Sequence, residues 1–177
     1  VGLQIQYSLI ERTPERDLLP MARALDIAVT AWGPLGGGLL TGKYNPEADK
    51  TAAADARYSV SPWGQGMLHD RNFSIAAEVV KLAGEIGRTP SQVAINWVRQ
   101  QKRGVVIPIL GARRLSQLQD NLACLDFTLT DEQMQRLNAA SSIELGFPHD
   151  FLASEGVQQV IYGNTLPLID HHRRPPG

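Results

Sequence analysis

The chain has 177 residues, of which 43% are hydrophobic, and a formal net charge of −1 from 17 basic and 18 acidic side chains. This length suffices for one globular core, and the balanced, interspersed charge argues against a nucleic-acid or anionic-membrane surface. The one cysteine, Cys124, excludes an internal disulfide and is expected to be buried in a reducing compartment. No apolar run approaches the roughly 18 residues of a membrane span and no signal-peptide pattern opens the chain, so we expect a cytoplasmic protein.

The first third of the chain predicts two strands joined by a helix. Apolar residues at every second position indicate a strand over about residues 3–8. A helix is expected to start near Asp17, and the nearly continuous apolar run 27–32 is typical of a parallel strand covered on both faces. Residues 33–67 are rich in Gly, Pro, Asn, Asp and Ala, which predicts a long loop beyond the carboxyl end of that strand.

The rest of the chain predicts four helices around one strand. One helix is expected to end at Gly87, and Thr89 with Pro90 begins the next. A short strand at 105–107 precedes a helix whose apolar seam is Leu115, Leu118 and Leu122. Thr130 and Gln133 form a capping box for the last regular helix, and a weakly periodic tail begins near residue 141.

This order of elements predicts an α/β fold built from right-handed βαβ units around a parallel sheet. Three strands alone make a poor parallel sheet, because both edges stay unpaired and the helix layers lack cover. We therefore expect the chain to supply the last three-eighths of a larger closed structure.

The run VTAWGPLGGGLLTGKY at 29–44 carries the strongest functional signal. A buried strand that ends in a glycine cluster brings bare backbone close to a ligand at its carboxyl end, and Trp32 is well placed to stack on a flat ring. The pattern indicates a pocket for a nucleotide or a similar planar molecule.

Four motifs in order resemble the C-terminal half of an aldo-keto reductase. They are QIQYSL at 4–9, WGPLGGGLLTGKY at 32–44, TPSQVAINW at 89–97 and PILGARR at 108–114, and FPHD at 147–150 is similar to one branch of that family. The resemblance implies a partial (β/α)8 barrel over 1–140, with strands six to eight, followed by a tail or substrate-side loop over 141–177. It also implies hydride transfer between NADPH and an aldehyde or ketone.

The matched positions imply roles at the nicotinamide and pyrophosphate. Gln4 would hydrogen-bond the nicotinamide carboxamide, although a polar strand residue paired within the barrel is the alternative. Trp32 would stack on the nicotinamide ring, with core packing as the alternative. The start of the glycine loop would let the backbone approach the pyrophosphate at Gly33, Pro34, Leu35 and Gly36. The alternative is that this loop acts only as a hinge.

The last motif implies the adenosine end of the same site. Gly111 and Arg113 lie where a strand gives way to a helix, and the Arg113 fork would bind the 2′-phosphate, which favours NADPH over NADH. Gln117 and Asn121, four residues apart, would reach one adenine together. Arg114 is expected to be solvated.

No catalytic residue is predicted within the chain. The tyrosine, lysine, aspartate and histidine of the family's reaction belong to strands that precede residue 1, so Lys43 and Tyr44 are not assigned to catalysis, and the chain alone is expected to be inactive. His171 and His172 lack a third ligand at metal spacing, so no metal site is predicted.

Two alternatives stay open beside a soluble reductase. Potassium-channel beta subunits share similar motifs, which would make the chain part of a non-catalytic, redox-sensing subunit, although Gly33 and the triple glycine depart from their pattern. Alternatively, two copies pair through their open strand edges as a homo-oligomer. The expected partner is a small carbonyl substrate, with neither nucleic acid nor membrane.

Overall fold

The fold is built on a three-stranded parallel sheet, seen in a computed structural model that describes residues 2–44 and 66–170. The strands, in spatial order, are β1 (Gly2–Gln6), β2 (Ala28–Trp32) and β3 (Val106–Pro108). Gln6 pairs with Trp32, and Ala31 pairs with Pro108, so the carboxyl ends of all three strands meet at one edge. The expected α/β fold with a parallel sheet is confirmed.

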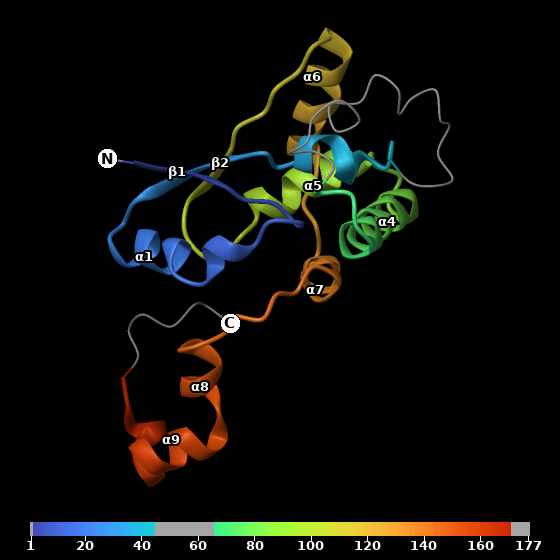
Figure 1. Cartoon of the computed structure of the whole chain (residues 1–177). Helices are drawn as coiled ribbons and strands as arrows, with labels where there is room; N and C mark the ends of the chain where they lie inside the picture. Colours follow the sequence, from blue (N-terminus) through green and yellow to red (C-terminus); the bar gives the residue numbers. More distant parts are fainter. Residues whose placement is uncertain (1, 45–65, 171–177) are drawn as a thin grey trace.

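Helices connect and cover the strands (Figure 1). The α-helices are α1 (Leu18–Ala24), α4 (Asp70–Glu85), α5 (Pro90–Arg99), α6 (Leu115–Leu122), α7 (Asp131–Ala140), α8 (His149–Ala153) and α9 (Glu155–Tyr162). Short 3-10 turns are η1 (Thr13–Glu15), η2 (Gly36–Thr41), η3 (Ala123–Asp126) and η4 (Gly163–Leu168). The capping box predicted at Thr130 is present at the start of α7, and Thr89, predicted only as a helix start, forms a second capping box with Gln92 at the start of α5.

The core lies on one face of the sheet. Val29 and Ala31 of β2 point into it and are fully covered, together with Leu39 of η2, Val79 of α4 and Trp97 of α5. Alternation along each strand sends the intervening side chains to the opposite face. There Trp32 remains 41% exposed and Ile107 48% exposed, so within the described residues this second face is open.

A buried polar cluster, which we call the Tyr7 cluster, fastens the segment after β1 to the helices. Its members are Tyr7, Arg12, Glu15, Trp97, Asn138 and Ser141. The Tyr7 hydroxyl donates to Glu15 Oε1 at 2.7 Å, and the Arg12 guanidinium donates to both oxygens of Glu15 at 2.7 and 2.9 Å. Burial raises the pKa of the Tyr7 hydroxyl and the neighbouring Glu15 carboxylate raises it further, so the phenol keeps its proton.

The same cluster joins elements far apart in sequence. Arg12 Nη1 donates to the Asn138 carbonyl and to Ser141 Oγ, both at 2.9 Å, and the Trp97 indole N–H donates to Asn138 Oδ1 at 2.9 Å. The Arg12 guanidinium also lies 5.3 Å from the centroid of the Trp97 ring. Buried charge is tolerated here because each group has a partner.

Several predictions need correction. Leu115, Leu118 and Leu122 do share a face of α6, but that face is turned outward, with Leu115 70% exposed. β1 ends at Gln6 rather than residue 8, and β3 extends to Pro108. The predicted loop 33–67 begins with the η2 turn, and residues 45–65 of it lie outside the described part of the chain.

The tail predicted from residue 141 contains regular structure. α8, α9 and η4 form a small helical unit that lies apart from the sheet in Figure 1. Neither α8 nor α9 has a buried residue, and Phe147 and Val160 are strongly exposed. The expected weak periodicity is wrong for α9, because Val157, Val160 and Ile161 share one face of it, but that face is not packed within the described residues.

Candidate functional site

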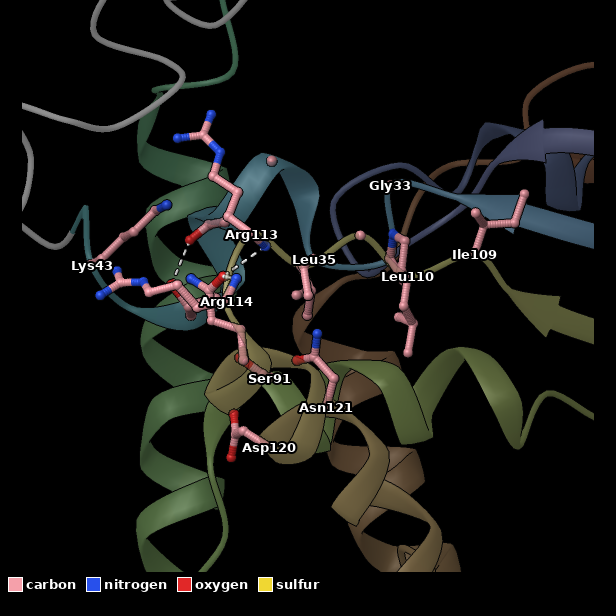
Figure 2. Close-up of a pocket in the computed structure, with 17 residues that line it drawn as sticks. Gly33, Leu35, Lys43, Ser91, Ile109, Leu110, Arg113, Arg114, Asp120 and Asn121 are labelled. Carbon is pink, nitrogen blue, oxygen red and sulfur yellow. Dashed lines mark hydrogen bonds between the residues drawn. The ribbon is translucent and has the colours of Figure 1, made fainter.

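A cavity of about 770 Å³ opens at the carboxyl edge of the sheet, between the glycine loop and the segment that leads into α6. Figure 2 shows its lining residues. One wall is Gly33, Pro34, Leu35, Gly37, Gly38, Thr41 and Lys43; the other is Ile109, Leu110, Gly111, Ala112, Arg113, Arg114, Gln117, Asp120 and Asn121; Ser91 of α5 lies between them.

Tight turns shape the glycine wall. Gly33 follows β2 with φ of 71° and its carbonyl accepts from Gly36 N at 2.9 Å, which turns the chain at once beneath the strand end. Gly38 has φ of 97°, and a Cβ there would lie 2.6 Å from Lys43 Cε. The positive φ favours glycine at this turn, and the end of the Lys43 side chain lies close against it.

The opposite wall is fixed at both ends. Ile109 N donates to the Ala31 carbonyl at 2.8 Å, which ties the end of β3 to β2. Gln117 Oε1 accepts from Arg113 N at 3.0 Å and from Arg114 N at 3.2 Å, and so caps the start of α6. These two hydrogen bonds fix the backbone of Arg113 and Arg114 at the point where the loop leads into α6.

Charge is distributed unevenly along the cavity. In Figure 2, Lys43, Arg113 and Arg114 lie toward one end, whereas Gly33, Ile109 and Leu110 lie toward the other. The one carboxylate among the lining residues belongs to Asp120, which accepts hydrogen bonds from α5. A cavity with a cationic end and an apolar end suits an elongated anionic ligand that carries a planar group.

The structure brings seven of the ten predicted site residues to this cavity: Gly33, Pro34, Leu35, Gly111, Arg113, Gln117 and Asn121. Gly36 is buried beneath the wall, where a Cβ would collide with Ile10. Gln4 and Trp32 do not line the cavity; they lie exposed on the open face of the sheet.

Gln117 and Asn121 lie on one helix face, but their side chains have different surroundings. The Gln117 carbonyl oxygen is directed to the backbone at the start of α6, and Asn121 is only 4% exposed. The Gln117 side-chain oxygen thus caps α6, a structural role that the four-residue spacing did not predict.

Five polar lining residues were not predicted from sequence: Thr41, Lys43, Ser91, Arg114 and Asp120. Arg114 is exposed, as expected, and it also lines the cavity beside Arg113. Two local signals pointed to this: the basic pair comes directly before a helix, and Lys43 follows a glycine turn.

Other kinds of site find no support in residues 2–44 and 66–170. These residues contain no group of three or more His, Cys, Asp or Glu side chains that could hold a metal ion. Among their helices, none combines the length and the apolar character needed to cross a bilayer. Cys124 is buried as expected, and burial raises the pKa of its thiol.

Comparisons with known proteins agree with this geometry. The profile of the Aldo/keto reductase family matches residues 1–142. The chain is 31% identical over 153 residues to the probable aryl-alcohol dehydrogenase AAD4 of Saccharomyces cerevisiae, covering 86% of this chain and 45% of that protein. It is 35% identical over 135 residues to the uncharacterized oxidoreductase YrpG of Bacillus subtilis, covering 76% of this chain and 38% of that one.

A solved structure shows the same arrangement. The glycerol dehydrogenase AKR11B4 from Gluconobacter oxydans superimposes with a TM-score of 0.64 at 30% identity, over 82% of this chain and 45% of that one. The chain thus spans about half the length of the relatives that it matches. Because the family profile covers most of its residues, the chain belongs to the aldo/keto reductase family of oxidoreductases.

Proposed function

We propose that the chain forms the NADPH-binding part of a reductase that transfers hydride between NADPH and an aldehyde or ketone. The observation that carries this proposal is the cavity at the carboxyl edge of the sheet, with its cationic end and its apolar end. NADPH carries a 2′-phosphate at its adenosine end, a pyrophosphate near its middle and a flat nicotinamide ring at its other end, which matches this polarity.

The cationic end would select NADPH over NADH. Arg113, Arg114 and Lys43 all line this end, and guanidinium groups bind phosphate through paired hydrogen bonds. A 2′-phosphate placed beside Arg113 gains such bonds, whereas the hydroxyl of NADH does not. The pyrophosphate would then lie along the glycine wall, where Gly33 has no side chain to keep it from the backbone.

The apolar end would hold the nicotinamide. Gly33 follows directly after Trp32, so this end of the cavity adjoins the open face on which Trp32 and Gln4 are exposed. Trp32 would stack on the ring and Gln4 would bind its carboxamide. When bound, the cofactor supplies the hydride, and these side chains hold its ring in a fixed orientation.

The remaining parts of the activity would come from outside residues 1–177. We propose that the open face of the sheet belongs to a (β/α)8 barrel in which this chain supplies strands six to eight, and that further strands carry the residues that protonate the carbonyl oxygen. The names of the relatives point to an alcohol or its carbonyl partner as substrate. We further propose that the reductase acts in the cytoplasm.

Calorimetric titration with NADPH and NADH tests the cofactor assignment. We expect NADPH to bind at least about tenfold more tightly than NADH, because each additional phosphate–arginine pair contributes on the order of 1–3 kcal/mol. Equal affinities for the two nucleotides would contradict the assigned role of the cationic end. Turnover is tested separately, by following nicotinamide absorbance with simple aldehydes.

A further inference from the structure

We propose that Gln92 and Thr89 are positioning residues of the cavity, because they hold Asp120 and, through it, helix α6 against the start of α5. This inference deepens the proposed function and rests on it. Neither Gln92 nor Thr89 lines the cavity, so their effect on a bound nucleotide would be indirect.

Helix α6 needs such a contact because its apolar face does not hold it in place. Leu115, Leu118 and Leu122 are all exposed, and from the start of α6 to the end of η3 only Asn121 and Cys124 are buried. A helix of eight residues is marginal by itself. Its orientation therefore depends on specific contacts with α5.

The contacts between the two helices converge on Asp120. Gln92 Nε2 donates to Asp120 Oδ1 at 2.9 Å and to the Asp120 carbonyl at 3.0 Å, and Thr89 Oγ1 donates to Asp120 Oδ2 at 3.2 Å. Both carboxylate oxygens and the backbone carbonyl of one residue are thus bound by the first turn of α5. Gln92 is only 6% exposed, so little water competes for these bonds.

The capping box fixes the orientation of these donors. Gln92 Oε1 accepts from Thr89 N at 3.4 Å, and Thr89 Oγ1 accepts from Gln92 N at 3.3 Å. With its oxygen committed to the cap, the Gln92 amide presents its NH2 group to Asp120. A reversed amide would place its oxygen against both the carboxylate and the carbonyl, which is unfavourable.

The clamp formed by Thr89, Gln92 and Asp120 connects three parts of the cavity. Asp120 lines it from α6 and Ser91 lines it from α5, between the two donors. One turn before Asp120, Gln117 caps the start of α6 and orients the backbone of Arg113 and Arg114. Movement of α6 at the clamp would therefore displace the arginine residues that are proposed to bind phosphate.

A charge-swap series tests the clamp in the full chain. Gln92→Glu places two carboxylates in contact and is expected to weaken NADPH binding about tenfold and to speed amide hydrogen exchange of residues 113–121 measured without nucleotide. Asp120→Asn keeps an acceptor for Gln92 and is expected to leave the exchange of residues 113–121 near wild type. The double variant Gln92→Glu with Asp120→Asn restores a donor–acceptor pair between the side chains but leaves a carboxylate against the backbone carbonyl of residue 120, so it should recover part of the lost exchange protection.

Gln100→Glu is the matched control, because Gln100 lies at the other end of α5 and bonds the backbone of Leu129 in a similar way. It is expected to lower stability while leaving exchange of residues 113–121 and NADPH affinity nearly unchanged. If Gln92→Glu does not fold, Thr89→Val and Thr89→Ser take its place. The serine variant should keep the wild-type exchange of α6, whereas the valine variant should lose it.

The proposal is overturned if Gln92→Glu leaves the exchange of α6 unchanged, if the double variant exchanges as fast as Gln92→Glu alone, or if both Thr89 variants exchange alike. Exchange is measured without nucleotide, so it tests the clamp even if no variant binds NADPH. If neither the wild type nor any variant binds NADPH, the proposed cofactor is refuted. The exchange data would still show whether Thr89, Gln92 and Asp120 hold α6 in place.

Discussion

Two polar clusters of this molecule differ in how their charges are arranged. In the Tyr7 cluster, the Glu15 carboxylate lies between Arg12 and the Tyr7 hydroxyl, and its partners are themselves bound to protein groups. In the cavity, cations from the glycine loop and from the start of α6 gather at one end, and the Asp120 carboxylate is turned to α5. A closed network indicates structural stabilisation, whereas a one-sided concentration of charge indicates a binding site for an anion.

Removal of Glu15 should have the largest effect on stability. Glu15→Ala leaves the buried Arg12 guanidinium without its carboxylate and the Tyr7 hydroxyl without its acceptor, so the free energy of unfolding should fall by about 3–5 kcal/mol. Urea denaturation measures this change. Glu11→Ala is the control, since Glu11 bonds only an exposed backbone N–H, and a loss as large as that of Glu15→Ala would contradict a special role for the cluster.

Removal of Arg113 should have the largest effect on binding. Arg113→Ala is expected to weaken NADPH binding roughly 30- to 100-fold while NADH binding changes little, because only NADPH carries the 2′-phosphate. Calorimetry measures both constants. Lys102→Ala removes an exposed cation that faces Asp131 outside the cavity and serves as the control; an equal loss for both nucleotides in Arg113→Ala would assign the residue to the pyrophosphate instead.

Trp32 should have a smaller effect at the apolar end of the site. Trp32→Ala is expected to weaken NADPH binding about tenfold, and Trp32→Phe to retain most of the affinity, because an aromatic ring can still stack. The stability of the protein should change little, since Trp32 is exposed. A large loss of stability without any change in affinity would show instead that Trp32 serves packing.

The smallest effect is expected at the surface ion pairs of α7. Arg136 binds Glu78 and Glu85 of α4, and its hydrogen bond lowers the pKa of Glu85 below the ordinary 4.5. A lowered pKa in the folded state means that the pair stabilises the protein above that pH and loses its contribution as the pH falls. Arg136→Ala should thus lower the denaturation midpoint slightly at neutral pH, and the difference from wild type should vanish in acid; a difference that grows in acid would contradict the assignment.

Local signals in the sequence predicted most of the elements, whereas the family resemblance supplied the seven predicted residues that line the cavity. Thr89 and Thr130 act within four residues of their own helix starts, so both helix starts and the capping box at Thr130 could be predicted directly. The spacing of Leu115, Leu118 and Leu122 correctly indicated a common face but not its exposure, because spacing does not say whether another element covers that face.

Features that depend on distant contacts could not be predicted. The bonds between Gln92 and Asp120 join residues 28 positions apart, and Arg12 reaches Ser141 across 129 positions. Arg114 and Lys43 enter the cavity only because two loops from different strands meet at one edge. Such pairings follow from the packing of the sheet and its helices, which the local pattern does not contain.

Amide hydrogen exchange with and without NADPH tests the central claim most directly, because it reports where the nucleotide contacts the chain. We predict that NADPH protects residues 33–43 and 109–121, which form the two walls of the cavity, and leaves α8 and α9 unaffected. Protection confined to α8 and α9, or none on either wall at saturating NADPH, would contradict the assignment of this cavity to the cofactor.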